Sequence, residues 1–186
     1  MSMSDLYEQI VSQRGAGQRL LSRIPGFRGY QDKAQRRTAD RLLRDYIAGE
    51  IAKRINRFAA LEKALLDMDG GLMYMSKTRS VKTKLQTYHD RINAAVPGYS
   101  GFFEAIKVGD EELEKLYSFD EAQIRYVERL DSELERFEEA VTRKVGVDEM
   151  IAALDALAAE ANEAFSLRES VLTNLDKTLG GSGSGI

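Results

Sequence analysis

The residues best suited to chemistry in this sequence are the basic side chains of its first third. Between Arg14 and Arg57 the chain carries 12 Lys and Arg against four Asp and Glu. Most of these cations are arginines, whose planar guanidinium groups form paired hydrogen bonds with phosphate and carboxylate groups. We therefore expect anion or partner binding to involve arginines that helical spacing places on the outer face of one long helix. These candidates are Arg36, Arg37, Arg41, Arg44, Arg54 and Arg57.

Three interpretations of this basic segment are open. In the first, it is a solvated face that meets the acidic second half of the chain. Residues 1–100 hold 18 Lys and Arg against 10 Asp and Glu, while residues 101–186 hold 9 against 20. In the second, the helix over residues 31–57 binds nucleic acid, although the net charge of −3 and the absence of a recognised nucleic-acid module argue against it. In the third, apolar residues interleaved with arginines over residues 19–30 meet an anionic membrane surface.

The sequence offers little material for catalysis or metal binding. Its one histidine is His89, and the residue three positions before it is Gln86, where a carboxylate-bridged metal bundle would need Glu. His89 and Asp90 are adjacent, and neighbours on a helix point about 100° apart, so we expect them not to orient each other. There is no cysteine, phosphate-binding loop or nucleophile elbow. We predict a protein that is not an enzyme, with no catalytic residue, metal or cofactor, and an exposed or half-buried His89.

Length and composition indicate one compact helical domain. The chain has 186 residues, of which 43% are hydrophobic and 31% are charged, which is typical of long, partly exposed helices. No apolar run approaches the roughly 18 residues that span a membrane. The N-terminus lacks the pattern of a secretory signal, so the expected location is cytoplasmic. Residues 1–179 are predicted to form the domain, and residues 180–186 a flexible Gly/Ser tail.

Hydrophobic spacing predicts an all-α fold of about five helices. Apolar residues recur every three or four positions over five segments, and no segment alternates with the period of a strand. The segments are 5–23, 31–68, 77–95, 110–145 and 148–179. Several are long, and their apolar spacing is close to a heptad. We therefore expect an antiparallel bundle with coiled-coil character.

Two short stretches that resemble each other are predicted to form corners between helices. They are residues 24–30 and 96–102, and they contain the only two prolines of the chain. Proline ends a helix, and glycine can adopt the left-handed backbone that a corner needs. The predicted corner residues are Pro25, Gly26, Gly29, Pro97, Gly98 and Gly101. Their aromatic neighbours are expected to be satellite core, with a binding cluster as the alternative; they are Phe27, Tyr30, Tyr99, Phe102 and Phe103.

Two glycines fall inside the first predicted helix. Gly15 and Gly17 flank Ala16, and each glycine costs a helix about 1 kcal/mol relative to alanine. Close packing of another element against this helix is the favoured explanation, and a hinge is the alternative.

Together these patterns favour a non-enzymatic interaction or scaffolding module that works by helix–helix docking. Long helices with continuous apolar stripes often bury surplus surface against another copy, so self-association is expected. The partner is predicted to be a second copy or another helical protein, with the basic and acidic halves steering the approach. Binding to an anionic membrane and binding to nucleic acid are the alternatives.

Overall fold

The computed structural model describes residues 2–95 and 109–180, with side chains as far as Thr173. This part of the chain contains six α-helices, two short 3₁₀ turns and no strand, which confirms the predicted all-α class. The helices are α1 (Met3–Val11), α2 (Ala16–Arg23), α3 (Arg36–Leu66), α4 (Met75–Ala94), α6 (Asp110–Arg143) and α7 (Val147–Gly180). The 3₁₀ turns are Lys33–Gln35 and Gly71–Tyr74.

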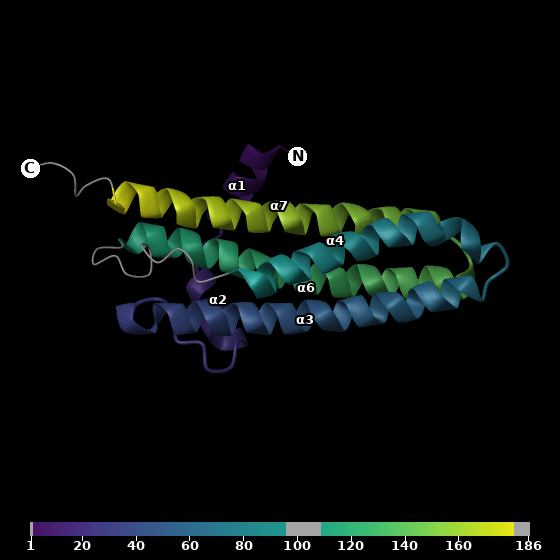
Figure 1. Ribbon diagram of the computed structural model, residues 1–186, viewed down its shortest axis with the longest axis horizontal. Coiled ribbons are helices and arrows are strands. Elements are labelled where there is room, and N and C mark those ends of the chain that lie inside the picture. The colour runs from purple at the N-terminus through teal and green to yellow at the C-terminus, as the bar shows by residue number, and fades with distance from the viewer. Residues whose placement is uncertain (1, 96–108, 181–186) are drawn as a thin grey trace, which may run out of the picture.

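Four long helices form an elongated bundle (Figure 1). Helices α3 and α4 form one antiparallel hairpin, and α6 and α7 form another. The hairpins lie side by side, so that α3 packs on α6 and α4 packs on α7, each pair running in the same direction. The two short helices lie outside this bundle, α2 against α6 and α1 against both α6 and α7. Both hairpin turns therefore lie at one end of the molecule, which we call the tip.

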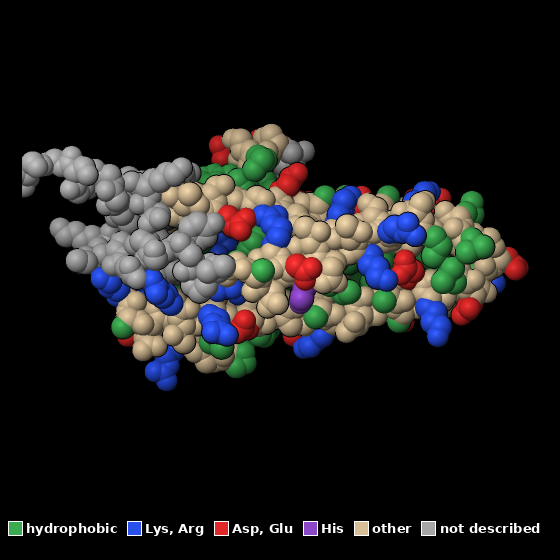
Figure 2. Space-filling view, in the orientation of Figure 1, with side chains coloured by type: hydrophobic (Ala, Val, Ile, Leu, Met, Phe, Trp, Pro, Cys, Tyr) green, Lys and Arg blue, Asp and Glu red, His purple; other side chains and the backbone are tan. Residues whose placement is uncertain are grey.

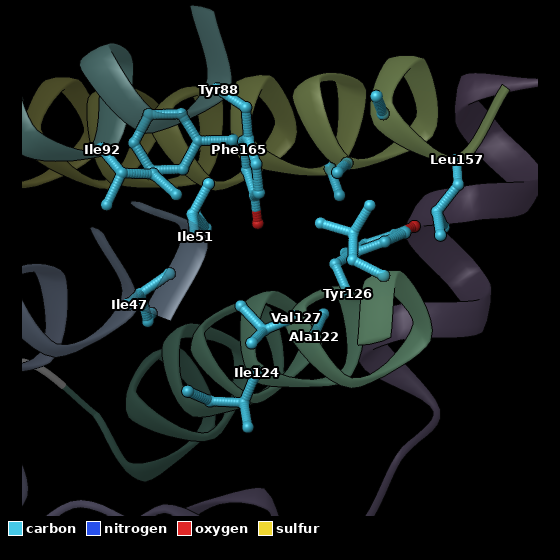
Figure 3. Close-up of a cluster of buried hydrophobic side chains, with 14 of the residues drawn as sticks. Ile47, Ile51, Tyr88, Ile92, Ala122, Ile124, Tyr126, Val127, Leu157 and Phe165 are labelled. Atoms are coloured by element: carbon cyan, nitrogen blue, oxygen red, sulfur yellow. The ribbon is translucent and has the colours of Figure 1, made fainter. Parts of the chain in front are cut away.

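The buried faces of three helices follow a strict heptad. In α6 the buried positions alternate in steps of three and four: Leu113, Leu116, Asp120, Gln123, Val127, Leu130, Leu134, Phe137 and Val141. The corresponding series in α7 is Val147, Ile151, Leu154, Ala158, Ala161, Phe165, Arg168 and Leu172. In α4 it is Thr78, Val81, Leu85, Tyr88 and Ile92. This spacing keeps one stripe of each helix facing its neighbours, and the resulting core is shown in Figure 3.

The turn between α3 and α4 follows Leu66, close to the end of the helical segment predicted over residues 31–68. Gly70 has a φ of +75°, in the left-handed region that favours glycine. A β-carbon on Gly71 would lie 1.8 Å from the carbonyl oxygen of Leu65, so no other residue fits there. The following residues, whose structure the sequence left ambiguous, form a 3₁₀ turn that leads directly into α4.

The single helix predicted over residues 5–23 is wrong, because the chain forms α1 and α2 instead. Gly15 has a φ of +73° and precedes α2, so this glycine is a break between helices. Gly17 is a packing glycine, since a β-carbon there would meet the Tyr117 ring at 3.3 Å. Close packing is therefore found at Gly17, whereas Gly15 ends the helical segment, and a hinge there stays a prediction.

The first Pro-Gly corner is confirmed. Pro25 lies between α2 and the 3₁₀ turn, and Gly26 and Gly29 have φ values of +78° and +80°. The corner is fixed by its aromatic residues, since Phe27 and Tyr30 are buried and their rings meet edge to face. These two residues are thus satellite core, as expected.

The second corner, with Pro97, Gly98 and Gly101, lies outside the described residues, as do Tyr99, Phe102 and Phe103. The predicted tail also lies outside them, except for Gly180, which is the last residue of α7.

Substitution of Gly29 tests how the first corner is held. In Gly29→Ala the new β-carbon would lie 2.6 Å from the Tyr117 hydroxyl and would be forced into the left-handed region. We expect the free energy of unfolding to fall by about 1–2 kcal/mol or more in a urea titration. Gly49→Ala is the matched control, because Gly49 lies inside α3 with nothing within 4 Å of the added carbon. It should raise the stability by about 0.5–1 kcal/mol. Equal effects at the two glycines would contradict this account.

Candidate functional site

Two of the six candidate arginines do not lie on the outer face, contrary to the prediction. Arg36 and Arg44 are 5% and 4% exposed. The Arg36 Nε donates a hydrogen bond to the carbonyl of Tyr30 at 2.7 Å, because the corner folds back over the start of α3. The Arg44 Nε donates to Asp40 at 2.9 Å, and its Nη1 donates to the carbonyl of Ile92 at the end of α4. These two side chains bind elements of their own chain.

The other candidate arginines differ in their exposure and in the elements that they contact. Arg54 is paired with Glu50 and with Asp131 of α6. Arg57 reaches Glu138 of α6 at 2.7 Å. By contrast, Arg37 and Arg41 are exposed, and the Arg41 Nε lies 3.8 Å from the carboxylate of Asp45. Anion binding at Arg37 and Arg41 stays a prediction.

The basic and acidic halves of the chain face each other, as the first interpretation of the charge pattern holds. Ion pairs join the two hairpins along their length, from Lys77–Asp148 near the tip to Arg91–Glu169 near the other end. Arg23 of α2 pairs with Glu128 of α6 in the same way. Exposed pairs of this kind each contribute about 0–1 kcal/mol. Together these ion pairs join the basic half of the sequence to the acidic half of the same chain.

A buried ion network that the sequence analysis missed lies in the half of the bundle away from the tip. Its centre is Arg168 of α7, which donates from Nε to Asp120 of α6 at 2.6 Å. The same guanidinium donates from Nη2 to Asp40 of α3 at 2.7 Å. Asp40 also accepts the hydrogen bond from Arg44. Three helices from both hairpins therefore meet at one guanidinium.

The network extends to the first corner through two tyrosines. The Tyr30 hydroxyl donates to the second oxygen of Asp120 at 2.7 Å. The backbone N–H of Tyr30 in turn donates to the Tyr117 hydroxyl at 2.6 Å, and the two rings are stacked with centroids 5.2 Å apart. The corner is thus tied to α6 by both its backbone and its side chain.

Burial and charge act in opposite directions on these groups. Desolvation raises the pKa of Asp120, and the charge of Asp40 adds to this, while Arg168 and the Tyr30 hydroxyl oppose it. Desolvation would lower the pKa of Arg168, but the nearby carboxylates outweigh it and the pKa is raised. Burial, followed by the charge of Asp120, raises the pKa of Tyr30. Arg168 consequently stays charged, with two carboxylates balanced by Arg44 and Arg168.

This arrangement suits a structural role and offers nothing to a substrate. The side chains of Arg168 and Asp120 are 4% and 0% exposed. Each carboxylate already accepts two hydrogen bonds from side chains of the network. A buried ion pair adds little net stability over an apolar pair, but a buried charge without its partner is costly. Such networks therefore favour the one alignment of the helices in which every charge is paired.

A second polar contact lies one turn along the bundle. Tyr88 reaches inward from α4 (Figure 3), and its hydroxyl donates to the Gln123 amide oxygen at 2.7 Å. The Gln123 amide donates to the carbonyl of Phe119 in its own helix. This contact joins α4 to α6 across the core, as Arg168 joins α7 to α3.

The sequence contained a signal for both contacts. The candidate residues of the sequence analysis included neither Asp120 nor Gln123, although both lie in the predicted helix over residues 110–145. A strict alternation of three and four passes through both of these polar residues. Arg168 likewise occupies a heptad position in α7. A charged residue at a position where a heptad requires an apolar one is the feature that marks a buried network.

The expectation for His89 is half right. Its side chain is 22% exposed, as predicted, but its Nδ1 lies 2.8 Å from the Asp90 carboxylate, so the two residues do meet. Hydrogen bonds from His89 and Gln86 lower the pKa of Asp90. This contact is local to one surface of α4.

Neither a metal cluster nor a membrane span is found in the described residues. Over residues 2–95 and 109–180, no three His, Cys, Asp or Glu side chains are grouped closely enough to hold a metal ion. None of the helices in this part of the chain is long and apolar enough to cross a membrane.

The tip carries a cluster of exposed apolar side chains. Of the six large apolar residues that are exposed in the described chain, four belong to the two hairpin turns. We call them the tip patch: Leu66 (45% exposed), Leu72 (77%), Met73 (69%) and Val145 (72%). Figure 2 shows apolar side chains gathered at this end, whereas charged residues are spread along the sides. Half-buried apolar residues of the adjoining segments are Met68, Tyr74, Met75 and Met150.

Removal of the central cation tests the role assigned to the buried network. In Arg168→Met, Asp40 and Asp120 remain buried with less compensating charge. We expect the free energy of unfolding to fall by about 3–5 kcal/mol in a urea titration. Arg23→Met, which breaks the exposed pair with Glu128, should cost less than about 1 kcal/mol. Replacing both aspartates by asparagine in the Arg168→Met background should recover part of the loss. A small effect of Arg168→Met would show that the network is dispensable.

Two features thus distinguish this bundle: a buried ion network and an exposed apolar tip. Comparison of the chain with protein-family models, curated proteins and solved structures finds no match. We therefore infer function from these two features.

Proposed function

We propose that this chain is a non-enzymatic interaction module that associates with a second copy of itself through the tip patch. The observation that carries the proposal is the placement of Leu66, Leu72, Met73 and Val145 together at one end. Contiguous apolar residues at a surface are favourable when another protein surface covers them. Methionine adds a flexible side chain that packs well against varied partners.

The remaining surface gives less support for docking along the sides. The apolar stripes of α3, α4, α6 and α7 are buried against one another within one chain. The charges that would steer a partner helix are engaged in pairs such as Lys77–Asp148 and Arg57–Glu138. In the described residues, four of the six exposed large apolar side chains lie at the tip.

The two alternatives have less support than self-association. In the segment proposed for a membrane, Leu20, Ile24, Phe27 and Tyr30 are buried and so unable to enter a lipid surface. At the tip, the exposed Asp67 and Asp69 would repel an anionic membrane and Lys144 would be attracted to it, so the loop charges do not favour this alternative. For nucleic acid, burial of Arg36 and Arg44 removes two of the six candidate arginines from the surface of the helix over residues 31–57.

Sedimentation velocity at micromolar concentrations tests the proposal. The wild-type chain should form a dimer, and Leu72→Ser/Met73→Ser should weaken it by at least about tenfold, because two exposed anchors are lost in each copy. Leu21→Ser is the matched control, since Leu21 is 48% exposed but belongs to α2, away from the tip. Its dimer should match the wild type. Circular dichroism should show the same helix content in all three proteins.

Two outcomes would overturn the proposal. One is a wild-type chain that stays monomeric up to about 100 µM, a concentration at which even weak dimers with a free energy near −6 kcal/mol are populated. The other is a monomer that binds neutral or anionic vesicles and loses this binding in Leu72→Ser/Met73→Ser, which would assign the tip patch to a membrane.

A further inference from the structure

The two loops of the tip carry charges of opposite sign. The loop between α3 and α4 contributes Asp67 and Asp69 and no cation, while the loop between α6 and α7 contributes Lys144 and no anion. All three side chains are exposed. Within the described residues, none of the three forms an ion pair. Each loop therefore presents free charge next to the apolar residues of the tip patch.

We propose that two copies meet tip to tip across a two-fold axis, so that the α3–α4 loop of each faces the α6–α7 loop of the other. This inference rests on the proposed self-association and adds its geometry. A two-fold contact uses the same surface on both copies, and that surface must be self-complementary. The two loops satisfy this requirement. In the proposed dimer the acidic loop of each copy faces the basic loop of the other, and the two tip patches meet at the centre.

The opposite arrangement is disfavoured by charge. If like loops faced each other, Asp67 and Asp69 would lie against their own copies beside an apolar surface that excludes water. Like charges placed together at an interface cost several kcal/mol, whereas opposite charges fix the register. Two residues on the adjoining helices reduce the difference in charge between the loops. Lys63 of α3 is a cation near the acidic loop, and Glu149 of α7 is an anion near the basic loop. The loop charges are therefore expected to set orientation, and the apolar residues affinity.

The backbone of both loops is well defined, which reduces the entropy lost on association. Gly70 has a left-handed φ of +75°, and Gly71, which lies against the Leu65 carbonyl, begins the 3₁₀ turn that presents Leu72 and Met73. In the other loop, Lys144 and Gly146 have φ values of +57° and +74°. Val145, between them, donates its backbone N–H to the carbonyl of Ala140. Surfaces already in their bound conformation associate at lower cost.

Charge exchange between the loops tests this geometry. Variant one is Asp67→Lys/Asp69→Lys, which makes both loops basic. Variant two is Lys144→Asp, which makes both acidic, and aspartate tolerates the left-handed backbone at this position. Each variant alone should dimerise at least about tenfold more weakly than the wild type by sedimentation velocity. An equimolar mixture of the two should form a heterodimer of near wild-type affinity.

The matched control is Glu8→Lys/Glu135→Lys, which changes net charge as variant one does but lies on α1 and the side of α6, at exposed positions. It should dimerise like the wild type.

If both loop variants also dimerise like the wild type while Leu72→Ser/Met73→Ser does not, the orientation is wrong and the proposed function stands. If the wild type itself is monomeric, both fail.

Cross-linking gives an independent readout, because the chain has no cysteine of its own. Asp69→Cys and Lys144→Cys proteins, mixed and treated with a short bis-maleimide, should give a heterodimer carrying one copy of each. Each protein treated alone should give several-fold less dimer. The reverse result, in which Asp69→Cys cross-links best to itself, would establish that like loops face each other and overturn the proposal.

Discussion

The fold of this chain depends on one guanidinium group held between two carboxylates inside the bundle. Arg168 joins Asp40 and Asp120, and through the hydroxyl of Tyr30 the same network reaches the corner before α3. Any shift of one hairpin by a helical turn would separate these charges in a buried site, where an unpaired charge is costly. Apolar layers elsewhere in the bundle tolerate such shifts better, because one leucine contact resembles another. The ion network therefore adds specificity to a core whose stability comes from burial of apolar surface.

The sides of the molecule and its tip differ in how well their side chains are paired or covered within the chain. Along the sides, ion pairs between the hairpins use much of the charge asymmetry of the sequence, and the apolar stripes face inward. At the tip, the helices end and the chain must turn twice, so the side chains there have no neighbouring helix to cover them. Leu72 and Met73 occupy such a turn, as does Val145 in the other hairpin. Exposed apolar surface is thus concentrated where packing within one chain cannot reach.

Most of the fold could be predicted from the sequence, because helical periodicity and turn residues are local signals. The long helices and the corner at Pro25 are examples. The different roles of Gly15 and Gly17 were less accessible, since a glycine inside a helical pattern is compatible with both a break and close packing, and the packing role of Gly17 depends on the Tyr117 ring far along the chain. Burial of Arg36 and Arg44 also depends on distant elements, namely the corner and the end of α4. The tip patch could not be derived from periodicity, because exposure of a turn is decided by what packs over it.

The parallel packing of one hairpin on the other also bears on how the chain folds. Contacts within each hairpin are closer in sequence than the ion pairs between hairpins, which join residues 71 to 128 positions apart, so we expect each hairpin to form before the two dock. During synthesis the basic hairpin, α3 and α4, leaves the ribosome before the acidic hairpin, α6 and α7, has been made. Long-range attraction between the two then accelerates their encounter, and dissolved salt weakens that attraction. From this packing we expect ionic strength to affect the docking of the hairpins more than the formation of each hairpin.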